Sequence, residues 1–131
     1  MNQALRLCGV LVLAGLSALA QPIDLPEGFV SQIAAAPPLV NHPIMATLGA
    51  RGQLFVGDAA GTNLNKAGLE KQLPNRVLLL TDTDGDGLYE HASVFADRMT
   101  FPQGGVWLEG SLYVASPPGL WKLTDTDNDG A

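Results

Sequence analysis

The chain has 131 residues, a formal net charge of −6 at pH 7 and one cysteine, Cys8. Its seven lysine and arginine residues are scattered and form no basic stripe, which argues against nucleic acid as a partner. Because Cys8 lies near the N-terminus, the rest of the chain has no disulfide, thiol nucleophile or thiolate metal site.

Residues 1–20 have the layout of a secretory signal peptide. Arg6 supplies a positive charge, Leu7 to Leu16 form an apolar core, and Ala18-Leu19-Ala20 ends in the small-residue pattern that signal peptidase cleaves. The apolar run is shorter than the roughly 18 to 20 residues needed to cross a bilayer, so we expect cleavage before Gln21 and no stable membrane span afterwards. The mature protein would be exported, to the periplasm, the cell envelope or the extracellular space.

Residues 21–43 are predicted to hold a short strand near Phe29, Val30 and Ile33, followed by an extended proline-rich linker. A four-stranded unit is expected over residues 44–95. Its strands are predicted at residues 44–48, 53–57, 76–80 and 89–95. The connection over residues 58–75 is polar and is predicted to be a long loop, whereas residues 76–80 are continuously apolar, as in a strand covered on both faces by neighbouring units.

A second unit, residues 104–131, repeats this order with strands predicted at residues 105–108, 112–115 and 119–123. The segment Leu80 to Gly87, LTDTDGDG, recurs as LTDTDNDG from Leu123, 43 positions later. A period of roughly 40 to 45 residues made of short strands is typical of a β-propeller blade. The sequence therefore predicts an all-β fold, with one four-stranded blade (residues 44–95) and an incomplete second blade (residues 104–131). The aromatic residues on these strands are expected to pack between blades; they are Phe55, Tyr89, Trp107, Tyr113 and Trp121.

The two acidic segments carry the chemistry of a cation site. A D-x-D-x-D-G run places three carboxylates on alternate residues of a tight turn, which is how calcium gathers oxygen ligands. The ligands predicted for the first loop are the side chains of Asp82, Asp84, Asp86 and Glu90 and the backbone carbonyl of Leu88. Those predicted for the second, incomplete loop are Asp125, Asp127 and Asp129.

Two other structures are compatible with acidic segments of this kind. A helix-loop-helix EF-hand requires a bidentate glutamate at the twelfth loop position, which is Ser93 here, and flanking helices where strands are predicted. Alternatively, Asp-Gly and Asn-Asp-Gly sequences make hairpin turns without any metal. Three alternating aspartates exceed what a turn needs, which favours a calcium loop between two strands. His42 and His91 lack partners at metal-ligand spacing and are expected to be exposed.

The order of several motifs resembles the start of the propeller of PVC-type haem-binding CxxCH proteins. This propeller is also described as a putative membrane-bound dehydrogenase domain, and it is similar to sorbosone and glucose dehydrogenase-like propellers. The resemblance covers nearly the whole chain after residue 20. The motifs that carry it are Leu25–Phe29, Gly52–Asp58, Arg76–Leu80 running into Asp82–Gly87, Val94–Asp97 and Phe101–Gly104.

This resemblance implies a propeller of the six-bladed type, of which the chain holds about one and a half blades. It also implies a downstream c-type haem domain and a quinone cofactor, both outside these 131 residues, so no catalytic or cofactor-binding residue is assigned here. The first functional hypothesis is the N-terminal part of an exported sugar or alcohol dehydrogenase that passes electrons to the haem. The alternative is a calcium-dependent binding or adhesion propeller. In either case the rest of the propeller is the expected partner, and no turnover is expected from this chain alone.

Overall fold

The computed structural model describes residues 23–127 and 129. The chain divides into two compact units, residues 1–31 and 32–131. In the first unit, residues 26–29 form a turn in which the Phe29 N–H donates to the Pro26 carbonyl (3.2 Å). The turn passes through Gly28, whose φ of +88° suits glycine.

Two expectations about the N-terminal region have different outcomes. The signal peptide predicted for residues 1–20 lies outside the described residues. The strand predicted near Phe29 to Ile33 is wrong, because these residues form no strand. Val30 is 94% exposed, and an isolated extended segment without a neighbouring strand has no ladder to receive its backbone hydrogen bonds.

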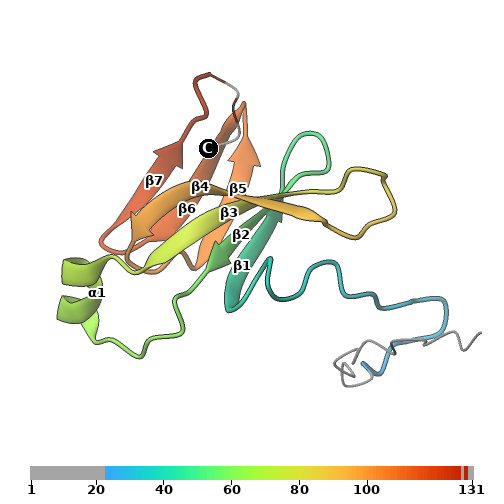
Figure 1. Cartoon of the computed structure of the whole chain (residues 1–131), viewed down its shortest axis with the longest axis horizontal. Helices are drawn as coiled ribbons and strands as arrows, with labels where there is room; N and C mark the ends of the chain where they lie inside the picture. The colour runs from blue at the N-terminus through green and yellow to red at the C-terminus, as the bar shows by residue number, and fades with distance from the viewer. Residues whose placement is uncertain (1–22, 128, 130–131) are drawn as a thin grey trace, which may run out of the picture. The chain divides into compact units, whose positions relative to one another are not determined.

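The first sheet of the second unit is an antiparallel meander with strand order β1-β2-β3-β4. Its strands are β1 (Pro43–Leu48), β2 (Leu54–Asp58), β3 (Asn75–Thr81) and β4 (His91–Met99) (Figure 1). Each of the four strands predicted for residues 44–95 is present. The fourth begins two residues later than expected and continues four residues further.

The second sheet is a three-stranded antiparallel meander in the order β5-β6-β7. It contains β5 (Gly104–Leu108), β6 (Ser111–Ser116) and β7 (Gly119–Leu123). The turn between β5 and β6 has positive φ at both central residues, Glu109 (48°) and Gly110 (77°), as a two-residue type I′ hairpin requires. The described residues thus form seven strands and one short helix, which confirms the all-β class.

The core lies between the two sheets. The Phe55 ring on β2 stacks on the Trp107 ring of β5, with centroids 5.0 Å apart and planes 12° apart. Phe95 on β4 meets the Phe55 ring edge-on at 4.8 Å. Leu112 and Val114 of β6 complete this cluster from the second sheet, and both are fully buried. The expected packing of aromatic residues between units is confirmed for Phe55 and Trp107, whereas Trp121 is 49% exposed.

The opposite face of the first sheet has a different cover. Leu78 and Leu80 of β3 are buried there against Val40 and the neighbouring Leu39. The Tyr89 N–H donates to the Ala34 carbonyl (2.8 Å), which fixes the start of this covering segment, residues 34–40. Strand β3 is therefore buried on both faces as predicted, but residues 34–40 cover one of those faces in place of a neighbouring unit.

The connection between β2 and β3 contains helix α1 (Lys66–Gln72), where a loop was predicted. The Asn65 side chain caps the helix by accepting the Gly68 N–H (2.9 Å), and Leu73 ends it in the left-handed region (φ 47°). None of the seven helical residues is buried, so no apolar period marked the helix in the sequence. Within the described part of the chain, no helix is long and apolar enough to span a membrane.

Candidate functional site

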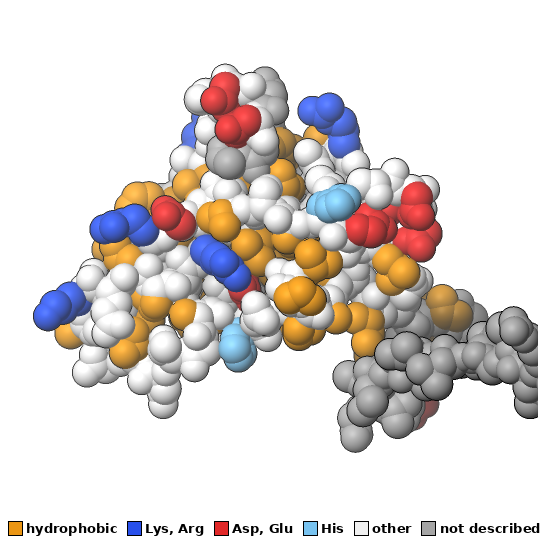
Figure 2. Space-filling view, in the orientation of Figure 1, with side chains coloured by type: hydrophobic (Ala, Val, Ile, Leu, Met, Phe, Trp, Pro, Cys, Tyr) orange, Lys and Arg blue, Asp and Glu red, His pale blue; other side chains and the backbone are white. Residues whose placement is uncertain are grey.

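The first acidic loop connects β3 to β4 and gathers four carboxylates. Asp82, Asp84, Asp86 and Glu90 each offer one oxygen, and these oxygens all lie within 4.8 Å of one another. Acidic side chains gather at two separate places on the visible face in Figure 2. The structure therefore brings together every side chain predicted as a ligand of the first loop.

Backbone N–H groups hold the loop in its ring-like form. Asp82 accepts the Gly85 N–H through Oδ1 (2.7 Å) and the Gly87 N–H through Oδ2 (2.9 Å). Both glycines have positive φ, +80° and +87°, which the tight path of the chain demands. Asp86 Oδ1 accepts the Leu88 N–H (2.7 Å), so Leu88 contacts the cluster through its amide.

Glu90, the residue just before β4, contacts the start of the loop. Its Oε2 accepts both the N–H and the hydroxyl of Thr83, each at 3.0 Å. The N–H groups of Gly87 and Gly85 hold the pKa of Asp82 below its ordinary value, and the Thr83 N–H lowers the pKa of Glu90 in the same way. Both carboxylates are thus ionised at neutral pH, as cation ligands must be.

Tyr89 lies against this acidic loop. Burial, followed by the negative charge of Asp82, raises the pKa of its phenol. The Tyr89 hydroxyl donates to the Gly52 carbonyl in the β1–β2 turn (2.8 Å). The Tyr89 ring therefore has a fixed place, within reach of the charge of Asp82.

The second acidic loop follows β7, as the first follows β3. Asp125, Asp127 and Asp129 again offer oxygens that lie within 4.8 Å of one another. At its start the Thr124 hydroxyl is hydrogen-bonded to the Ser111 hydroxyl (2.8 Å). Asn128 and Gly130 lie outside the described residues. Both loops leave their sheets at the end remote from α1 (Figure 1).

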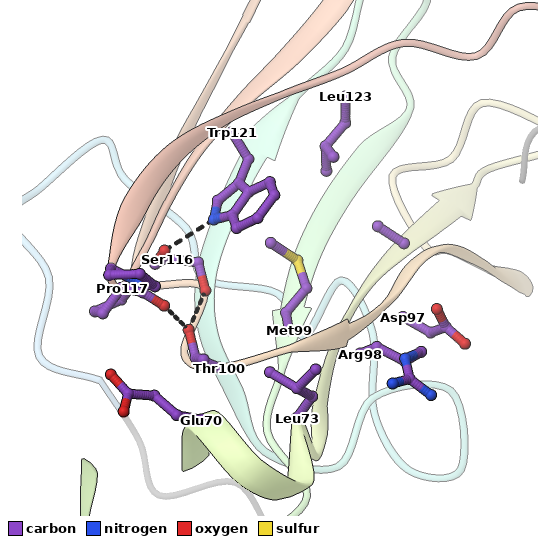
Figure 3. Close-up of a pocket in the computed structure, with 12 residues that line it drawn as sticks. Glu70, Leu73, Asp97, Arg98, Met99, Thr100, Ser116, Pro117, Trp121 and Leu123 are labelled. Atoms are coloured by element: carbon purple, nitrogen blue, oxygen red, sulfur yellow. Dashed lines mark hydrogen bonds between the residues drawn. The ribbon is translucent and has the colours of Figure 1, made fainter. Parts of the chain in front are cut away.

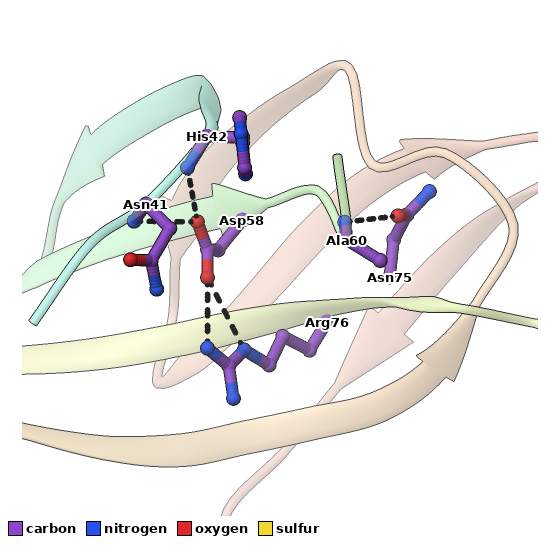
Figure 4. Close-up of polar contacts among 6 residues, drawn as sticks. All are labelled: Asn41, His42, Asp58, Ala60, Asn75 and Arg76. Carbon is purple, nitrogen blue, oxygen red and sulfur yellow. Dashed lines mark hydrogen bonds and ion pairs between the residues drawn. The ribbon is translucent and has the colours of Figure 1, made fainter. Parts of the chain in front are cut away.

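The other end of the first sheet contains a buried carboxylate that the sequence analysis missed. Asp58, the last residue of β2, is 2% exposed. Its Oδ1 accepts the N–H groups of Asn41 (3.1 Å) and His42 (2.8 Å), and its Oδ2 accepts two hydrogen bonds from the Arg76 guanidinium (2.9 and 3.3 Å) (Figure 4). We call this group of contacts the Asp58 clamp, because it ties the entry to β1 to the end of β2 and the start of β3.

The charge of Asp58 is maintained by these contacts. Burial alone would raise its pKa, but the His42 N–H, the Arg76 side chain and the Asn41 N–H outweigh burial and hold the pKa below its ordinary value. The described residues that line a surface depression of about 380 Å³ beside the clamp include His42 and Arg76. His42 itself is exposed, as predicted.

The second sheet has an equivalent clamp built on a hydroxyl. Ser116, the last residue of β6, lies 58 positions after Asp58 and is 1% exposed. Its Oγ accepts the Phe101 N–H (3.0 Å) and is hydrogen-bonded to the Thr100 hydroxyl (2.9 Å). A sequence signal for the two clamps was available. Two residue–proline pairs, His42-Pro43 and Phe101-Pro102, lie 59 positions apart, the first at the start of β1 and the second shortly before β5.

An apolar pocket of about 430 Å³ lies beside this second clamp (Figure 3). Trp121 and Met99 line it together with Leu73 at the end of α1. The Trp121 indole N–H donates to the Ser116 carbonyl (2.9 Å), and the Thr100 hydroxyl donates to the Pro117 carbonyl. The described lining residues include no histidine. The pocket can accept an apolar group but offers no imidazole as a general base.

The fold and the acidic loops define an all-β protein with two successive, equivalent antiparallel sheets. Residues 17–131 match the family model described as a domain of unknown function (DUF7133), and the chain belongs to this family. No curated protein and no solved structure matches the chain.

Proposed function

We propose that the chain is the N-terminal part of an exported β-propeller protein whose blade hairpins bind calcium. The observation that carries this proposal is the recurrence of one acidic loop at the same end of two successive antiparallel sheets. In this proposal the four-stranded first sheet is one blade, and the three-stranded second sheet is the first three strands of the next blade. A metal site repeated in step with the structural unit is a property of repeat architectures.

The chemistry of the first loop favours a hard divalent cation over a metal-free turn. A hairpin turn needs one or two residues that tolerate positive φ, and Gly85 and Gly87 already supply them. Four carboxylate oxygens within 4.8 Å of one another add a repulsion that the turn does not require. Calcium prefers six to eight oxygen ligands, which these carboxylates, backbone carbonyls and water would supply.

The wider assignment is an oxidoreductase-like propeller. Its support is the motif order shared with PVC-type haem-binding CxxCH proteins, together with the all-β fold. In this proposal a sugar or alcohol is oxidised, and the electrons pass to a c-type haem, with the haem and any quinone cofactor bound outside residues 1–131. Calcium then stiffens the hairpins and takes no part in the chemistry.

The alternative is a calcium-dependent binding or adhesion propeller without enzymatic activity. The observation that favours it is the helix-bearing connection over residues 59–74, which the second sheet replaces with a two-residue turn. The described residues of this connection help to line a second pocket of about 480 Å³. Such a surface connection is suited to contact a macromolecular partner.

Terbium luminescence tests calcium binding at the first loop directly. The Tyr89 ring next to the carboxylates would sensitise a bound Tb³⁺ ion, and calcium should displace that ion and quench the signal. Asp82→Asn combined with Asp84→Asn should weaken Tb³⁺ binding at least tenfold, because two of the charged ligands are lost. Tyr89→Phe should reduce the emission while leaving calcium affinity unchanged, because no ligand is removed.

Asp97→Asn is the matched control, since it removes an exposed carboxylate of β4 outside both acidic loops. It should bind calcium like the wild type. Equal calcium affinity of the wild type and the Asp82→Asn, Asp84→Asn variant would establish the metal-free turn. The oxidoreductase assignment is tested by the intact mass and haem staining of the native gene product in its cell envelope. A haem-staining band several times larger than 13.7 kDa supports it, and a product without haem contradicts it.

A further inference from the structure

The two sheets correspond residue by residue. Positions on β2 and β6 are 58 apart, so that Phe55 corresponds to Tyr113. Positions on β3 and β7 are 43 apart, so that Val77 corresponds to Leu120. The Asp58 and Ser116 clamps occupy matching positions, which supports this correspondence independently of the acidic loops.

In the first sheet, the face that carries Phe55 and Val77 is covered. Both side chains are at most 1% exposed, and they belong to the cluster that Leu112 and Val114 of β6 complete. Trp107 of β5 stacks on Phe55 at this interface. The second sheet thus covers this face of the first sheet, with Trp107 stacked on the Phe55 ring.

In the second sheet, the corresponding face is open. Because opposite residues of antiparallel strands share a face, Val106 pairs with Tyr113 on this side, and Leu120 pairs with Ala115. Leu120 is 73% exposed and Val106 is 55% exposed, and Leu108 on the same face is 53% exposed. Lys122, which corresponds to the buried Leu79, lies over the Tyr113 ring with its ammonium 5.9 Å from the centroid.

We propose that this face, formed by Val106, Leu108, Tyr113 and Leu120, is the docking surface for a third sheet of the same repeat. That sheet would present the kind of face that β5-β6-β7 presents to the first sheet, with an aromatic residue on Tyr113 as Trp107 lies on Phe55. This docking surface rests on the proposed propeller, because it is the face on which the next sheet of that propeller would pack. Several large apolar side chains exposed on one face of a sheet mark an interaction site.

A second copy of this chain fits the surface less well. For the same interface, that copy would have to offer the far face of its first sheet, where Leu78 and Leu80 lie. In this chain Val40 and Leu39 from the segment 34–40 already cover that face. A second copy would have to displace this cover, whereas a further sheet of the repeat would present an open face.

Site-specific photo-crosslinking in the native gene product, in its own cells, tests the proposal. A photoreactive residue at position 120 should cross-link to a peptide of short strands that leads into another D-x-D-x-D-G loop. The same residue at position 51, in the exposed β1–β2 turn, is the control and should not give this product. A cross-link from position 120 to residues 34–56 of a second copy overturns the proposal, as does the absence of any cross-link above the control.

A second measurement separates this inference from calcium binding. Leu120→Lys should lower the melting temperature of the native gene product by several degrees, because it places a charge in the proposed interface. The same substitution in the purified 131-residue chain should leave both the melting temperature and the terbium signal unchanged, because Leu120 is exposed there. Equal effects in the two proteins would contradict the docking surface, while an absent terbium signal would contradict only the calcium site.

Discussion

The Asp58 and Ser116 clamps perform the same structural task with different chemistry. Each is the last residue of the second strand of its sheet, and each accepts an N–H from the residue just before a proline. Asp58 is ionised and is neutralised by Arg76, whereas Ser116 is a neutral hydroxyl bonded to Thr100. The residue that corresponds to Arg76 is Gly119, so the second sheet lacks the cation that a carboxylate at position 116 would need.

This comparison shows what the two sheets share. Each sheet has a buried acceptor at the end of its second strand, and this acceptor pairs with N–H groups of the chain that turns into the first strand. Only the clamp of the first sheet adds an ion pair, between Asp58 and Arg76, to these hydrogen bonds. There Arg76, with 41% of its side chain exposed, brings a guanidinium to the surface beside His42.

Asp58→Ala should cause the largest loss of stability among the clamp variants. The substitution leaves the N–H groups of Asn41 and His42 unpaired and removes the partner of Arg76. We expect the free energy of unfolding to fall by about 2 to 3 kcal/mol, the range for lost hydrogen bonds to a charged group, because the half-exposed Arg76 guanidinium stays solvated. Thermal or urea unfolding of the purified chain measures this loss. A change below ~1 kcal/mol would show that water replaces the carboxylate, and that the clamp is not a stabilising element.

Ser116→Ala should have a smaller effect of the same kind. The Phe101 N–H loses its acceptor, but the Thr100 hydroxyl keeps its bond to the Pro117 carbonyl. A loss of about 1 to 2 kcal/mol is expected, as for one buried neutral hydrogen-bonding group. Urea unfolding should rank the wild type above Ser116→Ala, and Ser116→Ala above Asp58→Ala. The reverse order of the two variants would mean that the charge adds nothing to the first clamp.

Acidification sharpens the difference between a charged and a neutral clamp. The pKa of Asp58 is lower in the folded protein than in the unfolded chain. Its contribution to stability is therefore complete above the unfolded pKa of about 3.9 and is lost as the pH falls through the folded value. Melting temperatures between pH 7 and pH 2.5 should fall less steeply for Asp58→Asn than for the wild type. Ser116→Ala should keep the wild-type slope, and a wild-type slope in Asp58→Asn as well would contradict the charged clamp.

The sequence predicted those parts of the fold that are encoded locally. Strand β7 matches its predicted bounds, because Pro117-Pro118 precede it and the acidic turn follows it. The gathering of carboxylates in the first loop could also be predicted, since Asp82, Asp84 and Asp86 are near neighbours in sequence.

Long-range contacts escaped prediction for a physical reason. Asp58 looked like the first residue of a polar loop, because its amide partners at residues 41 and 42 are brought to it only by the pairing of β1 with β2. Likewise, the apolar run of β3 indicated burial on both faces but not what covers them. Residues 34–40 have no periodicity of their own and gain their position from packing on Leu78 and Leu80.

The helix-bearing connection of the first sheet gives the smallest expected effect. Asn65→Ala removes the side-chain acceptor of the Gly68 N–H and should destabilise α1 by about 1 kcal/mol. Because no residue of α1 is buried, this cost should remain local. Amide exchange should quicken within residues 66–72, while the global urea midpoint stays at the wild-type value. Lys66→Ala, which removes only the exposed ion pair with Glu70 (3.8 Å), is the control and should change exchange less. A shift of the global midpoint in Asn65→Ala would show that α1 is part of the core that both sheets share, and that the connection is not an independent addition to the repeat.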